Sequence, residues 1–343
     1  MIRAGVVGAT GYVGMELLRL LAGHPETEVA AVVSSSAEGR LADAFPQFSG
    51  HISLALESFS ADALAGKCDV VFTALPHGAS GPAIRALHEK GLPVIDMSAE
   101  LRYRDAALYK HWYGADNAVE DLLPGAVYGL CEVYRDKIKQ SDLIGNPGCY
   151  TTSAILALRP LIYDGLVEKQ GIVIDSKSGV SGAGKNATAT THFCESAGSF
   201  KAYGIGTHRH TSEIEQELSL AADHDIRVSF TPHLLPVKRG ILSTIYATPK
   251  PGVSAKIISE CYENAYADEP FVQLMDTAPE LKHIVGSNRV AIGFVHDERV
   301  NRIIIISCLD NLIKGAAGQA VQNMNIRFGM EETAGLDTPA WYL

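Results

Sequence analysis

A cysteine that begins a helix pattern is the residue of this chain best suited to covalent chemistry. Cys149 follows a Pro-Gly turn in the run NPGCYTTS, and an apolar helix pattern starts directly after it. The positive end of a helix dipole and the N–H groups of a first turn stabilise a thiolate, the form of cysteine that attacks carbonyl carbons. The same N–H groups can hold an oxyanion. We therefore predict that Cys149 is a nucleophile. Cys194 has no assigned role, and four other thiols are interpreted as inert core residues: Cys68, Cys131, Cys261 and Cys308.

Two histidines are candidates for the proton partner that such a nucleophile needs. His208 and His210 lie in the segment THRH, and alternation in an extended run would place both on one face. Ser212 and Glu215 match a capping box, which predicts that a helix begins there and that His210 lies on the turn before it. A histidine near a helix N-terminus stays closer to neutral and can exchange a proton with a developing alkoxide, so we favour His210. Glu213 either orients the imidazole or is a first-turn carboxylate favoured by the dipole.

Four cations are candidates for holding an anionic group of a substrate: Arg102, Lys185, Lys238 and Arg239. Arg102 follows a predicted strand end, where the ligands of open α/β sheets bind, and a guanidinium can hold a phosphate through two parallel hydrogen bonds. Lys238 and Arg239 open a strand pattern in the second half of the chain. A single charge of this kind is more often a solvated surface residue, so the interpretation depends on placement in the fold.

A glycine-rich turn near the N-terminus is typical of a dinucleotide site. The run GATGYVG lies between a strand pattern and a helix pattern. Glycines permit the tight turn and let N–H groups approach a pyrophosphate at the helix N-terminus. The G-x-x-G-x-x-G spacing differs from the usual G-x-G-x-x-G, so the strand–turn–helix context carries the assignment. The predicted cofactor contacts are Gly8, Thr10, Gly11, Tyr12, Val13 and Gly14.

The end of the second predicted strand indicates which dinucleotide binds. NAD enzymes usually place Asp or Glu there to bind the ribose 2′-hydroxyl. This chain has the run Ser34-Ser35-Ser36, with Arg40 close behind. Hydroxyls and a cation suit a 2′-phosphate, which a carboxylate would repel. We therefore expect NADP, with Ser34, Ser36 and Arg40 among its contacts.

Alternating strand and helix patterns position these residues in the first part of the chain. Strands are predicted at residues 4–7, 29–33, 70–74 and 93–97, and helices at 13–21 and 79–90. Such alternation implies a parallel sheet with crossover helices. Residues 1 to about 146 are therefore interpreted as a doubly wound domain.

The pattern changes after Cys149. An apolar helix is predicted from Thr151 to Leu158, ending near Pro160. Strand patterns then follow at residues 171–175, 227–230, 242–248, 290–295 and 302–309, with a hairpin through 296–301. This half is interpreted as a mixed or antiparallel sheet with helices on one side. A late helix at 314–328 is expected to pack back on the first domain, which would make that domain discontinuous.

Composition excludes several classes of protein. A chain of 343 residues with 47% hydrophobic and 20% charged residues is globular, with one to three domains. The formal net charge of -10 argues against nucleic acid as a partner. No C-x-x-C pair occurs, so we expect no metal and no thioredoxin-type chemistry. No apolar run is long enough to span a bilayer and no leader peptide is visible, so we expect a cytoplasmic protein without a membrane partner.

Together these segments resemble the N-acetyl-γ-glutamyl-phosphate reductases, a family of arginine-pathway enzymes among the semialdehyde dehydrogenases. The resemblance covers essentially the whole chain. Its specific parts are the turn GNPGCYT and the late run DNLIKGAAGQA, from Asp310 to Ala320. It also includes residues 8–14, 74–78, 96–102 and 208–210. Family members often carry Ser-Arg after the second strand, whereas this chain has Ser35-Ser36 with Arg40 further on.

The resemblance implies a Rossmann-like NADP domain of residues 1–147 and 312–343. It also implies an α+β catalytic and oligomerisation domain, residues 148–311, like those of aspartate-semialdehyde and glyceraldehyde-phosphate dehydrogenases. Cys149 would be acylated by the acyl phosphate to form a thioester, and His210 would be the acid/base. A homotetramer or homodimer is expected. Further predicted contacts are Pro76, Asn311 and Gly315 for the cofactor, and Arg102, Asn146, Glu213 and Lys238 for the substrate.

Other functions remain open at this level. The same chemistry fits an aspartyl phosphate or a carrier-linked aminoadipyl phosphate, because one sequence does not reveal which residues line the substrate pocket. A non-catalytic NADP-sensing protein would keep the glycine turn but would not need a thiol at a helix start. Nothing in the residues favours a scaffold protein beyond the expected oligomer.

Overall fold

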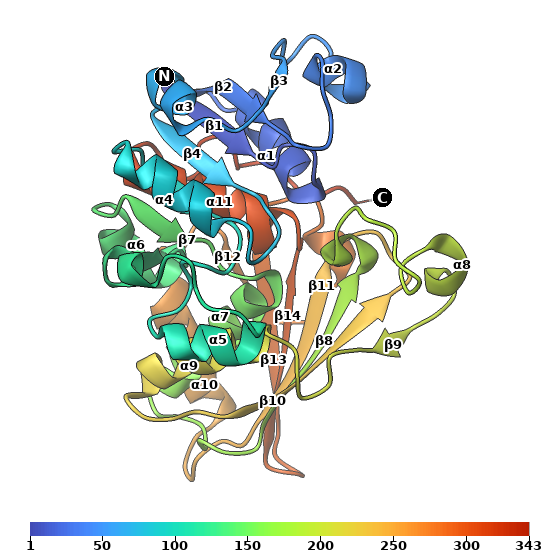
Figure 1. Ribbon diagram of the computed structural model, residues 1–343. Helices are drawn as coiled ribbons and strands as arrows, with labels where there is room; N and C mark the ends of the chain where they lie inside the picture. Colours follow the sequence, from blue (N-terminus) through green and yellow to red (C-terminus); the bar gives the residue numbers. More distant parts are fainter. Residues whose placement is uncertain (343) are drawn as a thin grey trace. The chain divides into compact units, whose positions relative to one another are not determined.

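The computed structural model describes residues 1–342, and the chain divides into two compact units (Figure 1). Unit 1 comprises Met1–Pro147 and Ala316–Asp337, and unit 2 comprises Gly148–Gly315 and Thr338–Leu343. The first break falls between Pro147 and Gly148, in the predicted turn of residues 146–149 that presents Cys149, named here the thiol turn. The division differs from the expected one at the C-terminal side, where residues 312–315 and the tail from Thr338 onward belong to unit 2.

Unit 1 is built on a seven-stranded parallel sheet with the order β3-β2-β1-β4-β5-β7-β6. The strands are β1 (Ile2–Val7), β2 (Thr27–Val33), β3 (Leu56–Glu57), β4 (Val70–Thr73), β5 (Val94–Asp96), β6 (Val127–Tyr128) and β7 (Leu143–Gly145). The central strands β4, β5 and β7 are buried along their whole length, because helices cover both faces of a parallel sheet. The order reverses between β1 and β4, where open α/β sheets bind their ligands. The predicted doubly wound domain is confirmed.

The helices of unit 1 include one from the far end of the chain. They are α1 (Tyr12–Ala22), α2 (Leu41–Ala44), α3 (Ala61–Lys67), α4 (Gly81–Glu89), α5 (Ala106–Tyr113), α6 (Cys131–Ile138) and α11 (Gly318–Arg327). Helix α11 packs against α1 and α6. Its buried amides are bonded within the unit: Gln319 Nε2 and Asn323 Nδ2 both donate to the Gly129 carbonyl, at 2.9 and 2.8 Å. The late helix therefore completes the first unit.

Unit 2 is built on a seven-stranded mixed sheet with the order β12-β13-β14-β11-β8-β10-β9. The strands are β8 (Ile172–Gly179), β9 (Lys201–Ala202), β10 (Val228–Leu235), β11 (Ile241–Ala247), β12 (Val272–Met275), β13 (Val290–Asp297) and β14 (Arg302–Leu309). The predicted hairpin is β13–β14, which pairs antiparallel from Val290↔Leu309 to Asp297↔Arg302. Pairs β8–β10 and β12–β13 are parallel, so the mixed form of the prediction is correct.

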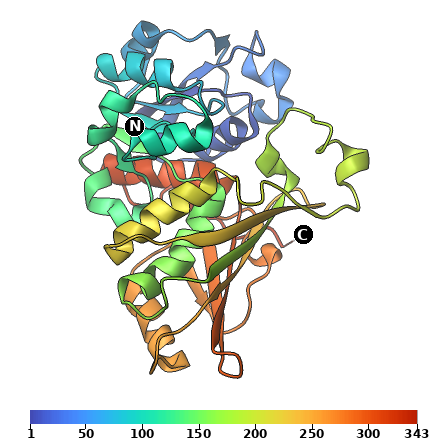
Figure 2. The ribbon, with the colours of Figure 1, turned by 60° about the horizontal axis from the view of Figure 1, so that its bottom comes forward.

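Three helices cover one face of this sheet: α7 (Cys149–Tyr163), α9 (His210–Ala222) and α10 (Ala255–Tyr266) (Figure 2). Helix α7 lies directly on it, since Ser153 Oγ donates to Ser243 of β11 and lies 3.0 Å from Ser307 of β14. A short helix α8 (Phe193–Ser196) stands apart in an excursion between β8 and α9. The remaining turns are η1 (Pro46–Phe48), η2 (Glu120–Gly125), η3 (Val180–Ala183), η4 (Leu281–His283) and the π-helix η5 (Ile313–Ala317).

Two predictions about helix ends are wrong. Helix α7 does not end near Pro160 but continues to Tyr163. Proline lacks the N–H that would bond the Leu156 carbonyl, and the Tyr266 hydroxyl donates to that carbonyl instead, at 2.5 Å. Late in the chain, the predicted single helix of 314–328 begins as the π-helix η5 before α11 takes over.

Candidate active site

Cys149 is the first residue of the fifteen-residue helix α7, as predicted. Gly148 is the N-cap in an extended conformation, and no acidic residue lies in the first turn. The side chain is half-buried. The helix dipole is therefore unopposed at the sulfur by any carboxylate in its own first turn, which favours the thiolate.

A buried carboxylate fixes the turn that presents this thiol. Glu213 is fully buried on the first turn of α9, and its Oε1 accepts a hydrogen bond from the Gly148 N–H at 2.8 Å. The Thr151 hydroxyl lies 2.9 Å from the same oxygen and 2.5 Å from the Gly148 carbonyl. Glu213 thus ties the start of α9 to the start of α7, a contact that the spacing of residues along the sequence does not reveal.

His210 lies against this turn, although not in the way predicted. The capping box is wrong: α9 begins at His210 itself, Ser212 Oγ donates to the Arg209 carbonyl, and Glu215 binds Arg227 and the Val228 N–H. A Cβ atom on Gly148 would lie 2.5 Å from His210 Nε2. The imidazole therefore rests on the backbone one residue before Cys149, and only glycine at 148 leaves room for it.

His208 lies next to His210 and accepts a hydrogen bond from its backbone. The two ring centroids are 4.9 Å apart, and the backbone N–H of His210 donates to His208 Nδ1 at 3.2 Å. Burial, followed by the charge of Arg209, lowers the pKa of His208 to about 4. His208 is thus neutral near pH 7 with Nδ1 already accepting a hydrogen bond, so His210 is the better candidate for the acid/base.

Aromatic rings surround the two imidazoles. Tyr150, Tyr203 and Phe230 each lie within 5.7 Å of the His208 ring centroid. The Tyr150 and Tyr203 hydroxyls are 2.9 Å apart. Burial raises the pKa of Tyr203 to about 12 and that of Tyr150 further, so both phenols stay neutral. The His208 ring therefore lies among neutral aromatic side chains, which accounts for the burial that lowers its pKa.

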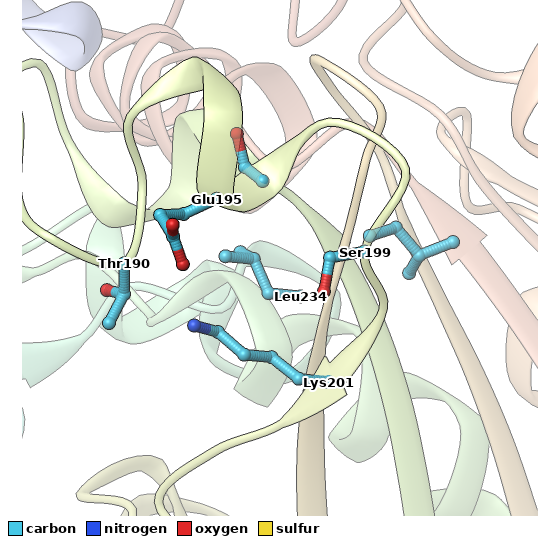
Figure 3. A pocket seen from close by; sticks show the side chains of 7 residues that line it. Thr190, Glu195, Ser199, Lys201 and Leu234 are labelled. Atoms are coloured by element: carbon cyan, nitrogen blue, oxygen red, sulfur yellow. The ribbon is translucent and has the colours of Figure 1, made fainter.

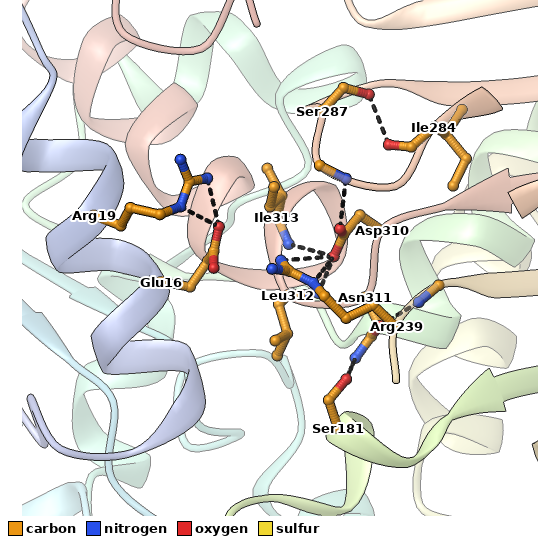
Figure 4. Close-up of polar contacts among 12 residues, drawn as sticks. Glu16, Arg19, Ser181, Arg239, Ile284, Ser287, Asp310, Asn311, Leu312 and Ile313 are labelled. Atoms are coloured by element: carbon orange, nitrogen blue, oxygen red, sulfur yellow. Dashed lines mark hydrogen bonds and ion pairs between the residues drawn. The ribbon is translucent and has the colours of Figure 1, made fainter. Parts of the chain in front are cut away.

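Two residues of the late DNLIKGAAG run contact the catalytic half of the molecule. Gly315 packs on the nucleophile, since a Cβ atom there would lie 2.7 Å from Cys149 Cβ. Asn311 accepts from the Gly240 N–H at 2.7 Å and donates to Ser181 Oγ at 3.0 Å (Figure 4). Both residues were predicted as cofactor contacts. Their observed contacts lie within unit 2, and their contact with the cofactor stays a prediction.

An ion pair that the sequence did not reveal lies beside them. Asp310 is fully buried at the end of β14, and its Oδ1 lies 3.1 Å from Arg239 Nη2 (Figure 4). Arg239, one of the predicted anion-binding cations, is thus paired within the protein. Lys238 and Lys185 are exposed, and their predicted substrate contacts stay predictions.

The glycine turn of unit 1 has the shape of a phosphate cradle. Gly8 follows β1 at φ +88°, and a Cβ atom there would strike the Ala74 carbonyl at the end of β4. A Cβ atom on Gly14 would strike the Gly8 carbonyl. Gly11 is the N-cap of α1, and a Cβ atom there would make only an ordinary van der Waals contact, 3.7 Å from the Gly8 carbonyl oxygen. The turn is thus closed on the protein side by its glycines and ends at the start of a helix, which fits a pyrophosphate.

A cluster of three hydroxyls lies beside this turn. Thr10 Oγ1 lies 3.0 Å from Ser34 Oγ and 2.9 Å from Ser36 Oγ. Ser34 follows β2 directly, and Arg40 is exposed at the start of α2. Three hydroxyls without a carboxylate at the strand end fit a phosphorylated ribose better than a free 2′-hydroxyl. The residues present therefore suit the expected cofactor.

Two other predicted residues of unit 1, Arg102 and Asn146, form hydrogen bonds to backbone carbonyls. Arg102 is buried, and its guanidinium donates to the Asn146 and Met97 carbonyls at 2.7 and 3.0 Å. Asn146 Nδ2 donates to the Ala316 carbonyl at 3.0 Å and its Oδ1 accepts from Asn323. These bonds hold the strand end that leads into the thiol turn. Whether either residue also contacts substrate stays a prediction, as does the cofactor contact of the exposed Pro76.

A buried acidic pair lies behind the Pro76 loop. Glu100 Oε1 accepts from the Gly78 and Ser80 N–H groups at 3.0 and 3.1 Å. Its other oxygen contacts the Ser98 hydroxyl, which also lies 2.6 Å from Asp96 Oδ2. Burial, then the charge of Glu100, raises the pKa of Asp96 to about 6. One serine proton cannot serve both carboxylates at once, which agrees with a raised pKa in this pair.

A shallow pocket in unit 2 involves other residues. It lies between the 190–201 excursion and the end of β10 and is lined by Thr190, Glu195, Ser196, Ser199, Lys201, Leu234 and Leu235 (Figure 3). Its lining contains one acid, Glu195, one base, Lys201, and none of the predicted site residues. Within residues 1–342, no helix is long and apolar enough to cross a membrane.

Comparison with known proteins gives the same two halves. Residues 3–141 match the family model for the semialdehyde dehydrogenase NAD binding domain, and residues 149–311 match that for the semialdehyde dehydrogenase dimerisation domain. An N-acetyl-γ-glutamyl-phosphate reductase of Caldicellulosiruptor saccharolyticus is 51% identical, with 98% of each chain covered. One of Acetivibrio thermocellus is 47% identical over the full length of both.

Solved structures share the fold at lower identity. Aspartate semialdehyde dehydrogenase II of Vibrio cholerae matches with a TM-score of 0.72 at 20% identity, covering 96% of this chain and 98% of that one. The enzyme of Candida albicans, solved with NADP, matches with a TM-score of 0.68 at 19% identity, covering 95% and 98%. The fold, the family models and the full-length relatives agree: the chain belongs to the N-acetyl-γ-glutamyl-phosphate reductase family of the semialdehyde dehydrogenases.

Proposed function

We propose that this chain reduces N-acetyl-γ-glutamyl phosphate to N-acetylglutamate semialdehyde with NADPH, releasing phosphate, as a step of arginine biosynthesis. The observation that carries the proposal is Cys149 at the start of α7 with the His210 imidazole against the preceding glycine. The names of the full-length relatives supply the substrate.

In the first half-reaction Cys149 acts as the nucleophile. Its thiolate attacks the acyl carbon, a C–S bond forms, and the bond from that carbon to the phosphate oxygen breaks. The products are a thioester on Cys149 and inorganic phosphate, which takes up from solvent the one proton that the overall reduction consumes. Splitting the reaction in this way replaces one difficult displacement by two easier steps.

In the second half-reaction the thioester carbon is reduced. NADPH, when bound, supplies the hydride. The N–H groups of the first turn of α7 stabilise the oxygen as it becomes negative, and His210 donates a proton to it. Breakage of the C–S bond then frees the aldehyde and the thiolate, and the proton returns to His210. Glu213 acts through the Gly148 N–H by keeping this turn in place.

NADPH is proposed over NADH on the hydroxyl cluster of unit 1. Thr10, Ser34 and Ser36 converge at the end of β2, where a carboxylate would repel a 2′-phosphate. Arg40 supplies a cation on the same loop. Gly8, Gly11 and Gly14, with Tyr12 and Val13 opening α1, would hold the pyrophosphate.

We also propose that the chain works as a homodimer or homotetramer. One face of the unit 2 sheet carries α7. The opposite face presents an apolar row that a second copy would bury: Val173, Tyr246, Ile304 and Val295.

The reverse reaction tests the function directly. Purified enzyme is given N-acetylglutamate semialdehyde, phosphate and NADP, and NADPH formation is followed by absorbance, with aspartate semialdehyde as the competing substrate. We expect the N-acetylated substrate to be preferred and Cys149→Ser to lower kcat by at least about 1,000-fold while NADPH still binds. Normal turnover by Cys149→Ser would end the thioester proposal, and preference for aspartate semialdehyde would end the substrate assignment.

A further inference from the structure

Asp310 organises the π-helix that follows β14. Its Oδ1 accepts from the Leu312 and Ile313 N–H groups at 2.8 and 3.3 Å and pairs with Arg239 (Figure 4). Its Oδ2 accepts from the Gly286 N–H at 2.9 Å, and its carbonyl accepts from the Gly315 N–H at 2.9 Å. One buried carboxylate thus fixes the first turn of η5 to the loop around Gly286.

This π-helix touches the nucleophile. Gly315 lies within η5, and its Cα packs so closely on Cys149 that a Cβ atom would come within 2.7 Å of Cys149 Cβ and 3.1 Å of its Cα. The position of Cys149 therefore depends on where η5 is held, and η5 is held by Asp310.

The C-terminal tail closes the other side of the Asp310 pair. The Trp341 ring lies over the Arg239 guanidinium, 5.1 Å from its carbon to the ring centroid. The same ring packs on Gly286, where a Cβ atom would lie 2.6 Å from the indole. The backbone N–H of Trp341 donates to the Val285 carbonyl at 2.8 Å. Trp341 thus contacts both partners of Asp310: the arginine that pairs with it and the loop that donates to it.

We infer that Trp341 is a positioning residue for Cys149, acting through Arg239, Asp310 and the π-helix η5. The indole keeps water from the Arg239–Asp310 pair, and a pair held at low dielectric is stronger than one in water. Removing the indole lets Arg239 move and be solvated, which loosens η5 and its contact with Cys149. The inference rests on the proposed function only in taking Cys149 as the nucleophile.

The test compares three variants of the tail in the full-length protein. Trp341→Ala removes the ring, Trp341→Phe keeps an aromatic face over Arg239, and Tyr342→Ala is the matched control, because its exposed ring lies over Lys282 instead. Two measurements are made on each: steady-state kinetics in the reverse direction, and the rate at which iodoacetamide alkylates Cys149 in the ligand-free protein, read peptide by peptide by mass spectrometry.

We expect Trp341→Ala to lower kcat by about tenfold with little change in KM for NADP, since even small misplacement of a reacting group is costly. Cys149 alkylation at pH 7 should slow by about threefold, because the sulfur spends less time over the first-turn N–H groups. Trp341→Phe should restore most of both rates, and Tyr342→Ala should match the parent.

Two results would overturn the inference. One is alkylation of Cys149 at the parent rate in Trp341→Ala. The other is new labelling of the buried Cys261 or Cys308, which would show that unit 2 has loosened as a whole. The alkylation rate does not depend on which substrate the enzyme uses. If the substrate assignment fails, the alkylation rates of the variants still test the inference. If the inference fails, the substrate preference of the parent enzyme in the reverse reaction is unchanged.

Discussion

At the scale of single residues, two glycines define the surroundings of the thiol. Gly148 leaves room for the His210 imidazole and Gly315 leaves room for Cys149 itself. Any side chain at either position would move a reacting group. These glycines carry no chemistry of their own, but the distance between nucleophile and proton partner depends on both.

The buried acidic pair of unit 1 predicts an unusual dependence of stability on pH. The pKa of Asp96 is raised from 3.8 to about 6, so the folded protein keeps a proton that the unfolded chain releases. The free energy of unfolding should therefore fall as the pH rises from about 4 to about 6, by roughly 3 kcal/mol from this group, and stay lowered above that.

Asp96→Asn tests this because an amide mimics the protonated acid. Its oxygen can still accept from Thr73 Oγ1 and the Ser98 N–H, and its NH2 can donate to Ser98 Oγ. We expect the melting temperature of the variant to rise relative to that of the parent between pH 4.5 and 7. Parallel melting curves for the two proteins across that range would contradict a raised pKa.

Local sequence predicted the residues whose roles depend on a helix start or a turn. Cys149 and the glycine turn could be found because a Pro-Gly turn before an apolar helix, and glycines between a strand and a helix, are local patterns. The packing roles of Asp310, Gly315 and Trp341 could not be predicted, since they arise from contacts between segments far apart in the sequence; Gly315 was predicted only as a cofactor contact. Arg102 was found as a cation, but its bonds to buried carbonyls required the folded backbone.

At the scale of elements, the proline inside α7 shows how a helix can continue past a residue that should end it. Pro160 leaves the Leu156 carbonyl without its helical donor, and Tyr266 on α10 supplies one at 2.5 Å. The neighbouring Tyr262 hydroxyl donates to the Ala157 carbonyl at 2.6 Å, where the helix also provides its own N–H from Leu161. The two tyrosines therefore differ in what their loss leaves behind.

Tyr266→Phe should lower the free energy of unfolding by about 1–3 kcal/mol, because it leaves a buried carbonyl without a donor. In a Pro160→Ala background the new N–H can bond that carbonyl, and the cost of Tyr266→Phe should shrink. Tyr262→Phe is the matched control, with the same cost in both backgrounds. Urea titrations of the parent, the three single variants and the two double variants measure this, and equal costs of Tyr266→Phe in both backgrounds would refute the explanation.

Some predicted bounds of strands and helices were accurate and others were not: α1 and α4 were predicted within two residues, whereas β8 and β10 extend four and five residues past their predicted ends. Strand β14 was predicted at its observed bounds, and β11 and β13 within two residues, because β-branched runs with turn signals are local. The start of α9 was missed because Glu215, taken as a capping residue, is used by Arg227 and the Val228 N–H from the approach to β10. A capping box cannot be told from such a tertiary contact by spacing alone.

At the scale of the whole molecule, the helices α7, α9 and α10 of residues 1–342 lie together on one face of the unit 2 sheet. Ser176, Ser243 and Ser307 point to the side of α7, so residues of opposite parity point the other way. Strand register then places four apolar residues in one row across four strands: Val173, Tyr246, Ile304 and Val295. Val295 is 62% exposed, and Val173 and Tyr246 are each 37% exposed.

A row of this kind on a single chain predicts association. Contiguous exposed apolar surface is rare on monomers and marks interaction sites, and an apolar row crossing four strands suits the same face of a second copy. Replacing Tyr246 by Glu would place a charge in the middle of the buried row, where it would have to be desolvated without a partner. We therefore expect Tyr246→Glu to elute as a smaller species than the parent in size-exclusion chromatography with light scattering.

Val300→Glu is the control, since Val300 is 58% exposed but lies in the turn between β13 and β14, outside the row. It should keep the parent mass. If Tyr246→Glu also keeps the parent mass while remaining folded, the subunits must meet elsewhere. Helices α7 and α9 build the thiol turn within one chain. If a monomeric Tyr246→Glu is alkylated at Cys149 at the parent rate, the thiol turn does not need the neighbouring subunit.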